Sequence, residues 1–270
     1  MSDLAAEPAS PSLASLEVET APEYVVGFPV HVAVTIRADQ PDASLRLLPY
    51  ADFFKCAGAF GLTLIRAGSG QAVVSVQPRP VVDRSLGIAV FSLPPNQSRR
   101  MLIDLSAFLP ADLAPGDYQA TLAYGPPNMR AVSPAFALRL RAPAREECAE
   151  LAALLPGVRT IGGWGQWILQ PPSDRRDPPK VRKTDPLRFN RVLRWWLFGE
   201  RLEPSLVQAL DGIYAPEADA LTAELYQVAG DQTKFEQQAQ AVRTRHHGLS
   251  WWMDDLAAGR GIIAFHRGQR

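Results

Sequence analysis

The chain of 270 residues has few of the features that identify a reaction. It contains only two cysteines, Cys56 and Cys148, and their wide separation argues against a disulfide framework or a cysteine-based zinc site. Lysine plus arginine equals aspartate plus glutamate, at 28 each, so no overall field draws the chain to nucleic acid or to a membrane. A neutral protein is also poorly protected against self-association, which favours an oligomer or a partner-bound form.

Long apolar runs are absent as well. No segment approaches the roughly 20 apolar residues needed to span a bilayer. Residues 1–12 are rich in alanine, proline and serine, are expected to be disordered, and lack the basic and apolar regions of a signal peptide. We therefore expect a soluble protein in a cytoplasm of bacterial type, without membrane contact.

Tryptophan is absent from the first 163 residues, and all six tryptophans follow in three close pairs. The spacing of apolar residues also changes, from a period of two to a period of about 3.6, near Pro143. These two changes predict an α+β protein of two domains, an antiparallel β-sandwich over residues 13–142 and a Trp-rich, mostly α-helical domain over residues 144–270.

The N-terminal part contains short runs in which apolar and polar residues alternate. In the run from Val30 to Ile36, every second residue is apolar, as in a half-buried strand. Similar runs recur through this part, separated by turns rich in glycine, proline and asparagine. They lie at 16–18, 45–48, 62–65, 73–76, 88–93, 101–105, 118–124 and 136–140. Eight or nine such strands favour a sandwich.

One local motif refines this prediction. Residues 112–120, DLAPGDYQA, resemble the turn into the F strand of immunoglobulin-like domains. The resemblance implies that the Tyr118 hydroxyl bonds back to the preceding corner, and that the sandwich is immunoglobulin-like. Ala120 stands where antibody domains have cysteine, so the resemblance is to the broad class, and it implies no function.

Helical periodicity predicts the elements of the C-terminal part. Helices are expected over residues 144–155, 186–198, 204–210, 216–229, 233–245 and 251–258. Glycines predict a loop or short strand at 162–169, and residues 261–265 are expected to form a strand or a docking tail. Residues 216–245 resemble a single tetratricopeptide-like helical hairpin, without the further copies that a repeat array needs.

Aromatic residues supply one set of candidate partner contacts. Phe53, Phe54 and Phe60 lie in a segment without periodicity, which is either an exposed contact loop or a loop that caps one end of the sandwich. Adjacent tryptophans on a helix point about 100° apart, so Trp195 and one of Trp251 and Trp252 are candidates for an edge or interface. The alternative for all tryptophans is core packing.

A basic segment supplies the second set. Residues 170–185 have no apolar period and are expected to form a mobile loop. Its basic residues are Arg175, Arg176, Lys180, Arg182 and Lys183. The segment is either a working part, cleaved by a protease or in contact with an anionic polymer such as nucleic acid, or an ordinary solvated loop.

Sites of catalysis are not evident. His31 occupies the polar face of a predicted strand and is expected to be exposed. A hydrolase that pairs Cys148 or Cys56 with His246 or His247 is one hypothesis. However, Cys148 lies on an apolar stripe where a thiol would be buried and inert. We expect no enzyme activity, no catalytic, cofactor-binding or metal-binding residue, and no cofactor.

The sequence is thus most consistent with a non-catalytic adaptor, regulatory or structural subunit that binds another protein or itself. The edge strands of the sandwich are additional candidate contacts, because they can accept a strand from a partner.

Overall fold

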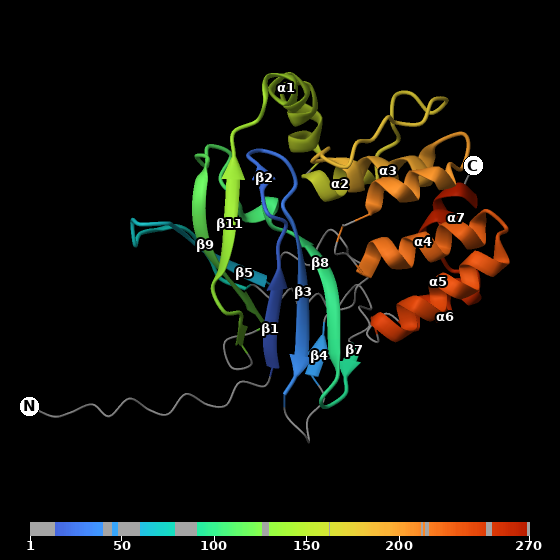
Figure 1. The fold of residues 1–270 in the computed structure, drawn as a ribbon, viewed down its shortest axis with the longest axis horizontal. Coiled ribbons are helices and arrows are strands. Elements are labelled where there is room, and N and C mark those ends of the chain that lie inside the picture. The colour runs from blue at the N-terminus through green and yellow to red at the C-terminus, as the bar shows by residue number, and fades with distance from the viewer. Residues whose placement is uncertain are drawn as a thin grey trace, which may run out of the picture.

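The computed structural model describes residues 14–39, 45–47, 60–78, 91–125, 130–161, 163–211, 213, 216–246 and 250–268. Two main sheets and a layer of helices form the molecule (Figure 1). The observed class is α+β, as the sequence predicted.

Two sheets pack face to face in the N-terminal part. The first has the order β1 (Ala14–Glu19), β3 (His31–Ala38), β8 (Ser98–Asp104). The second has the order β2 (Tyr24–Val25), β11 (Phe136–Arg141), β9 (Gly116–Tyr124), β5 (Phe60–Arg66), β6 (Ala72–Val76), with β10 (Ala131–Val132) also paired to β9. Strands β4 (Leu45–Leu47) and β7 (Phe91–Leu93) form a separate pair. All pairs are antiparallel except β2 with β11.

The core between the sheets comes from the predicted alternation. Val32, Val34 and Ile36 of β3 share one apolar cluster with Leu62 of β5 and Leu122 of β9, and all five are buried. The strands fall within a few residues of the predicted runs, so this part of the prediction is confirmed. The predicted corner bond is also present, because the Tyr118 hydroxyl donates to the carbonyl oxygen of Ala114 at 2.5 Å.

Seven helices are described in the C-terminal part. They are α1 (Arg145–Thr160), α2 (Trp164–Ile168), α3 (Arg188–Phe198), α4 (Pro216–Val228), α5 (Gln232–Arg245), α6 (Ser250–Ala257) and α7 (Ile262–Gly268). Short 3₁₀ helices lie at η2 (Leu105–Phe108) and η4 (Pro204–Leu210). Helices α4 and α5 form the predicted hairpin.

Three local predictions were wrong. Helix α1 continues through Pro156 instead of ending at residue 155, because proline costs one backbone bond but does not stop a helix by itself. Residues 164–168 form helix α2, in which both tryptophans are buried, so packing overrides the low helix propensity of the glycines. Residues 262–268 form helix α7 instead of the strand that was one expectation, whereas the contacts of α7 with α3 and α4 agree with the alternative of a docking tail.

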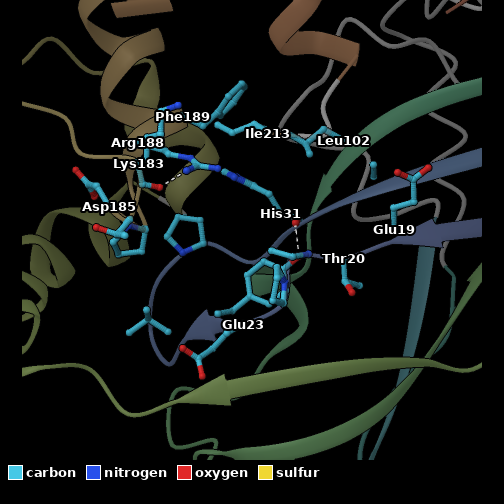
Figure 2. A pocket seen from close by; sticks show the side chains of 18 of the residues that line it. Glu19, Thr20, Glu23, His31, Leu102, Lys183, Asp185, Arg188, Phe189 and Ile213 are labelled. Carbon is cyan, nitrogen blue, oxygen red and sulfur yellow. Dashed lines mark hydrogen bonds between the residues drawn. The ribbon is translucent and has the colours of Figure 1, made fainter. Parts of the chain in front are cut away.

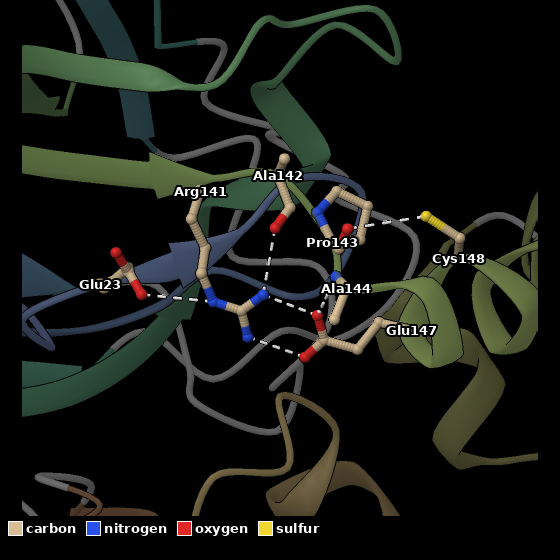
Figure 3. Close-up of polar contacts among 7 residues, drawn as sticks. All are labelled: Glu23, Arg141, Ala142, Pro143, Ala144, Glu147 and Cys148. Atoms are coloured by element: carbon tan, nitrogen blue, oxygen red, sulfur yellow. Dashed lines mark hydrogen bonds and ion pairs between the residues drawn. The ribbon is translucent and has the colours of Figure 1, made fainter.

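One connection between the helical part and the sandwich lies where β11 leads into α1. Arg141, the last residue of β11, donates to both carboxylate oxygens of Glu147 in α1, at 2.6 and 2.7 Å, and also pairs with Glu23 (Figure 3). The Glu147 carboxylate also accepts the backbone N–H of Ala144, at the start of α1. The Arg141 guanidinium is the main reason that the pKa of Glu147 lies below its usual value.

A second connection closes the open edge of β8. Glu217, in the first turn of α4, is fully buried and accepts the backbone N–H of Leu102 at 2.6 Å. Since β8 is an outer strand of its sheet among the described residues, this carboxyl supplies one of the acceptors that a neighbouring strand would supply. One apolar cluster contains residues from both parts, including Leu102 of β8 and Leu221 of α4. The independence of the two predicted domains therefore stays a prediction.

A second buried carboxyl lies on the same helix, two turns later. Glu224 accepts the backbone N–H groups of Ile263 and Ala264, at 2.5 and 3.1 Å, and so caps the start of α7. A Cβ at Gly261 would overlap the Glu224 side chain, so glycine is required where the carboxyl approaches the backbone. Burial raises the pKa of Glu217 to about 8 and that of Glu224 to about 7.

The buried carboxyl predicts how stability depends on pH. Because the pKa of Glu217 is raised from 4.5 to about 8, the folded state binds a proton that the unfolded state releases between these values. The contribution of Glu217 to the free energy of unfolding is thus expected to be greatest below pH 4.5 and to be lost as the pH rises through 8. The free energy of unfolding of Glu217→Gln should equal that of the wild type at pH 5. At pH 8.5 it should be larger than that of the wild type by on the order of 3 kcal/mol.

Urea unfolding at several pH values measures this difference. The control is Glu236→Gln, since Glu236 is exposed on α5. An identical pH dependence of the wild type and Glu217→Gln would show that Glu217 is ionised in the folded protein.

Candidate functional site

The candidate aromatic contacts that the structure describes are buried. Phe60 begins β5, with its ring centroid 4.8 Å from that of Tyr124 inside the sandwich. The exposed fraction is 3% for Trp195 and 6% for Trp252. The prediction that Phe60 and Trp195 form partner contacts was therefore wrong, whereas the prediction that one of Trp251 and Trp252 does so stays a prediction. Phe53, Phe54 and the side chain of Trp251 lie outside the described part of the chain.

Trp195 and its neighbour Trp196 are both buried, although they point in different directions. The Trp195 ring lies on the backbone of Gly199, where a Cβ would overlap it. The indole N–H of Trp196 donates to the carbonyl oxygen of Glu203 at 3.2 Å. Helix α3 is thus enclosed on more than one side, which the sequence pattern alone did not show.

The basic segment 170–185 is exposed, as predicted, and forms neither helix nor strand. Its start is bound to α3, because Arg194 donates to the carbonyl oxygens of Gln170 and Pro171 and stacks on Trp167 at 4.2 Å. Burial lowers the pKa of Arg194 to about 10. Lys183 pairs with Asp211 at 3.3 Å. The predicted mobility of the segment stays a prediction.

The hypothetical cysteine–histidine pair lies on separate elements. Cys148 is exposed on α1, where its thiol lies 3.7 Å from the carbonyl oxygen of Pro143 (Figure 3), so the expectation of a buried thiol was wrong. His246 ends α5 and lies 2.9 Å from the carboxylate of Asp219 on α4. Cys56 and His247 are outside the described residues.

A cavity of about 470 Å³ lies between the first sheet and the start of α3 (Figure 2). The segment 19–25 and residues of β3 and β8 form one wall, and residues 183–189 form another. Tyr24, Leu102 and Phe189 supply apolar surface. The sequence did not predict this cavity, because its walls come from segments about 150 residues apart.

His31 lies in this cavity and not at the free surface, so the prediction that it is exposed was wrong. Its ring centroid is 5.3 Å from that of Phe189, in an edge-to-face arrangement. The sequence predicted that the face of β3 opposite the valines would be polar and exposed. At His31 the helical part covers this face. Burial lowers the pKa of His31 below its usual value, which favours the neutral form of the ring.

Most charges around the cavity are already paired. Arg141 binds Glu147 and Glu23, and Glu19 pairs with Arg100 at 2.5 Å. Asp185 pairs with Arg191 at 2.9 Å, and burial raises its pKa.

Arg188 differs from the other cations of the cavity. Its guanidinium donates to the carbonyl oxygen of Lys183. Among the residues that the structure describes, no carboxylate forms an ion pair with it, and the nearby Asp185 pairs with Arg191. Neither ring nitrogen of His31 takes part in a hydrogen bond within the same described part. Arg188 was not among the residues that the sequence predicted for a site.

An apolar cavity of about 410 Å³ lies beneath α1. Phe28 stacks on Trp164 there, and the indole N–H of Trp164 donates to the carbonyl oxygen of Gly27 at 3.3 Å. No cluster of histidine, cysteine, aspartate or glutamate suited to a metal ion occurs among the described residues. None of the helices in the described ranges is long and apolar enough to cross a membrane.

Strand β6 is a different kind of candidate. Among the described residues it is the last strand of its sheet, and Val73 and Val76 are 41% and 36% exposed. The hairpin of β5 and β6 projects from the sandwich on the side opposite to the helices (Figure 1).

Comparison with known proteins gives little further information. No known protein family and no curated protein matches the chain. A CARDB domain from Pyrococcus furiosus, crystallised in complex with di-metal ions, is similar in structure, with a TM-score of 0.26 and 9% identity. The match covers 47% of this chain and 87% of that domain, which has an immunoglobulin-like fold. A likeness at this score carries no argument about function.

The burial of Trp195 predicts a large effect of its removal. Trp195→Ala should lower the free energy of unfolding by about 3–5 kcal/mol, because it leaves a cavity beside Gly199. Phe265→Ala is the control, since Phe265 is 59% exposed, and it should change stability by less than about 0.5 kcal/mol. Denaturant unfolding measures both. If Trp195→Ala lowered the free energy of unfolding only slightly, Trp195 would again be a candidate surface contact.

Proposed function

We propose that this protein is a non-catalytic, cytoplasmic interaction subunit that binds an extended strand of another protein along β6. The observation that carries the proposal is the exposure of Val73 and Val76 on the outer strand of a sheet. An outer strand presents unpaired backbone groups that can bond to a further strand. We further propose that the sandwich belongs to the immunoglobulin-like class, in which such additions to a sheet are geometrically possible.

Two of the outer strands, β6 and β8, differ in what covers their edges. The edge of β8 is closed by the Glu217 carboxyl and by α4. In contrast, β6 has the sequence AVVSV, without a charge or a proline that would discourage pairing. An uncharged, apolar outer strand is a hazard for solubility unless a partner covers it.

The composition of β6 indicates the chemistry of the partner strand. Val73 and Val76 are both exposed apolar side chains, and Val73 lies where the pairing of β5 with β6 shifts register. A partner segment with small apolar residues would cover these valines, and backbone bonds would supply most of the affinity.

A test of this proposal introduces charge at the edge. Val73→Lys and Val76→Lys should leave the fold intact, because both side chains are exposed, and should block strand addition. Val132→Lys is the matched control, since Val132 is 50% exposed on β10. We expect affinity capture with the wild type and Val132→Lys to recover the same stoichiometric partner, and the β6 variants to lose it.

Two outcomes would contradict the proposal. One is a partner that the β6 variants retain. The other is slow hydrogen exchange throughout β6 in the isolated monomer, which would show that its backbone groups are already covered. A wild-type dimer that both β6 variants convert to a monomer would identify the bound strand as a second copy and not another protein.

A second candidate function is contact with an anionic polymer, or regulated cleavage, at residues 170–185. It is favoured because Arg175, Lys180 and Arg182 are exposed and form no ion pair within the described part of the chain. Replacing all five basic residues of the segment by glutamine should abolish binding to nucleic acid or a polyanion and leave the fold unchanged. Binding of nucleic acid or a polyanion equal to that of the wild type would exclude this candidate function.

A further inference from the structure

We infer that the cavity between the first sheet and α3 binds a small carboxylate with an apolar body, and that Arg188 anchors the carboxylate. The cavity lies on the side of the sandwich that faces the helices, whereas the β5–β6 hairpin projects from the other side (Figure 1). The inference is therefore independent of the function proposed for β6.

The charges of the cavity favour an anion. Arg141 and Lys183 are neutralised by Glu147 and Asp211, respectively. Arg188 is the cation of the described lining that lacks a carboxylate partner. Its guanidinium carries five N–H donors in a planar fork, and the carbonyl oxygen of Lys183 is the protein acceptor found for it. Such a fork binds a carboxylate through two parallel hydrogen bonds.

His31 provides a second polar group at the same site. Figure 2 shows it entering from the strand side, while Arg188 enters from α3. In its neutral form, one ring nitrogen donates and the other accepts a hydrogen bond. The ring can thus orient a ligand without adding a second charge.

The remaining walls favour an apolar body. Phe189, Tyr24, Leu102, Ile213 and Pro29 contribute aromatic and aliphatic surface around the two polar groups. A volume of about 470 Å³ lies within the range of ligand pockets, which are mostly apolar with a few polar groups that fix orientation. A bare inorganic anion would leave this surface uncovered.

Calorimetric titration of the full chain with phenylacetate tests the inference. We expect the wild type to bind phenylacetate, and Arg188→Met to bind it about tenfold more weakly or worse, as is typical for loss of a charged hydrogen bond. Arg182→Met is the matched control, because Arg182 is exposed on the adjacent segment and does not line the cavity, and should bind like the wild type. Phenylacetamide, which has the same body without the charge, should bind at least tenfold more weakly than phenylacetate.

Three results would overturn the inference. The first is that Arg188→Met binds phenylacetate as tightly as the wild type does. The second is that the wild type binds phenylacetamide as tightly as phenylacetate. The third is that the wild type binds inorganic phosphate as tightly as phenylacetate, which would indicate an anion site without a role for the apolar walls. An NMR titration of the wild type tests the same site even if Arg188→Met does not fold. Phenylacetate should shift the NMR signal of the His31 ring and leave that of His266 unchanged, and an unshifted His31 signal would also refute the site.

Discussion

The bond between the Glu217 carboxyl of α4 and the backbone of Leu102 in β8 is the contact on which the arrangement of this protein depends. A sheet edge and a helix start both present backbone N–H groups that need an acceptor. Helix α4 supplies acceptors for both, since Glu217 reaches the edge of β8 and Glu224 reaches the start of α7. The two residues are seven positions apart and therefore lie on nearly the same face of the helix. This helix links the sandwich to the C-terminal end of the chain.

Local patterns in the sequence were sufficient to predict the strands. Alternation defines them because each strand has one face toward the core, and the DLAPGDYQA segment predicted the bond made by Tyr118 because that bond is local. The α4–α5 hairpin was predicted for the same reason. In contrast, helix α2 forms in a glycine-rich segment because Trp164 and Trp167 are buried against distant residues.

The site could be predicted less well than the fold. The environment of His31 depends on Phe189, which is 158 positions later in the sequence, and no period reveals such a contact. Trp195 was expected at an edge because it lies off the main apolar stripe, but the backbone of Gly199 forms a second surface for it. Both errors have one cause. Other parts of the chain cover helix α3 on more sides than its single apolar stripe predicts. The cavity with Arg188 arises where this covering is incomplete.

Gly261 has a consequence for the evolution of the chain. The Glu224 side chain occupies the space that any larger residue at 261 would need. A mutation of Gly261 alone displaces the carboxyl from the start of α7, and a mutation of Glu224 alone leaves backbone N–H groups there without their acceptor. Neither single step is neutral. These two positions, 37 residues apart, are therefore linked in one direction, and homologues with a larger residue at 261 should also have replaced Glu224.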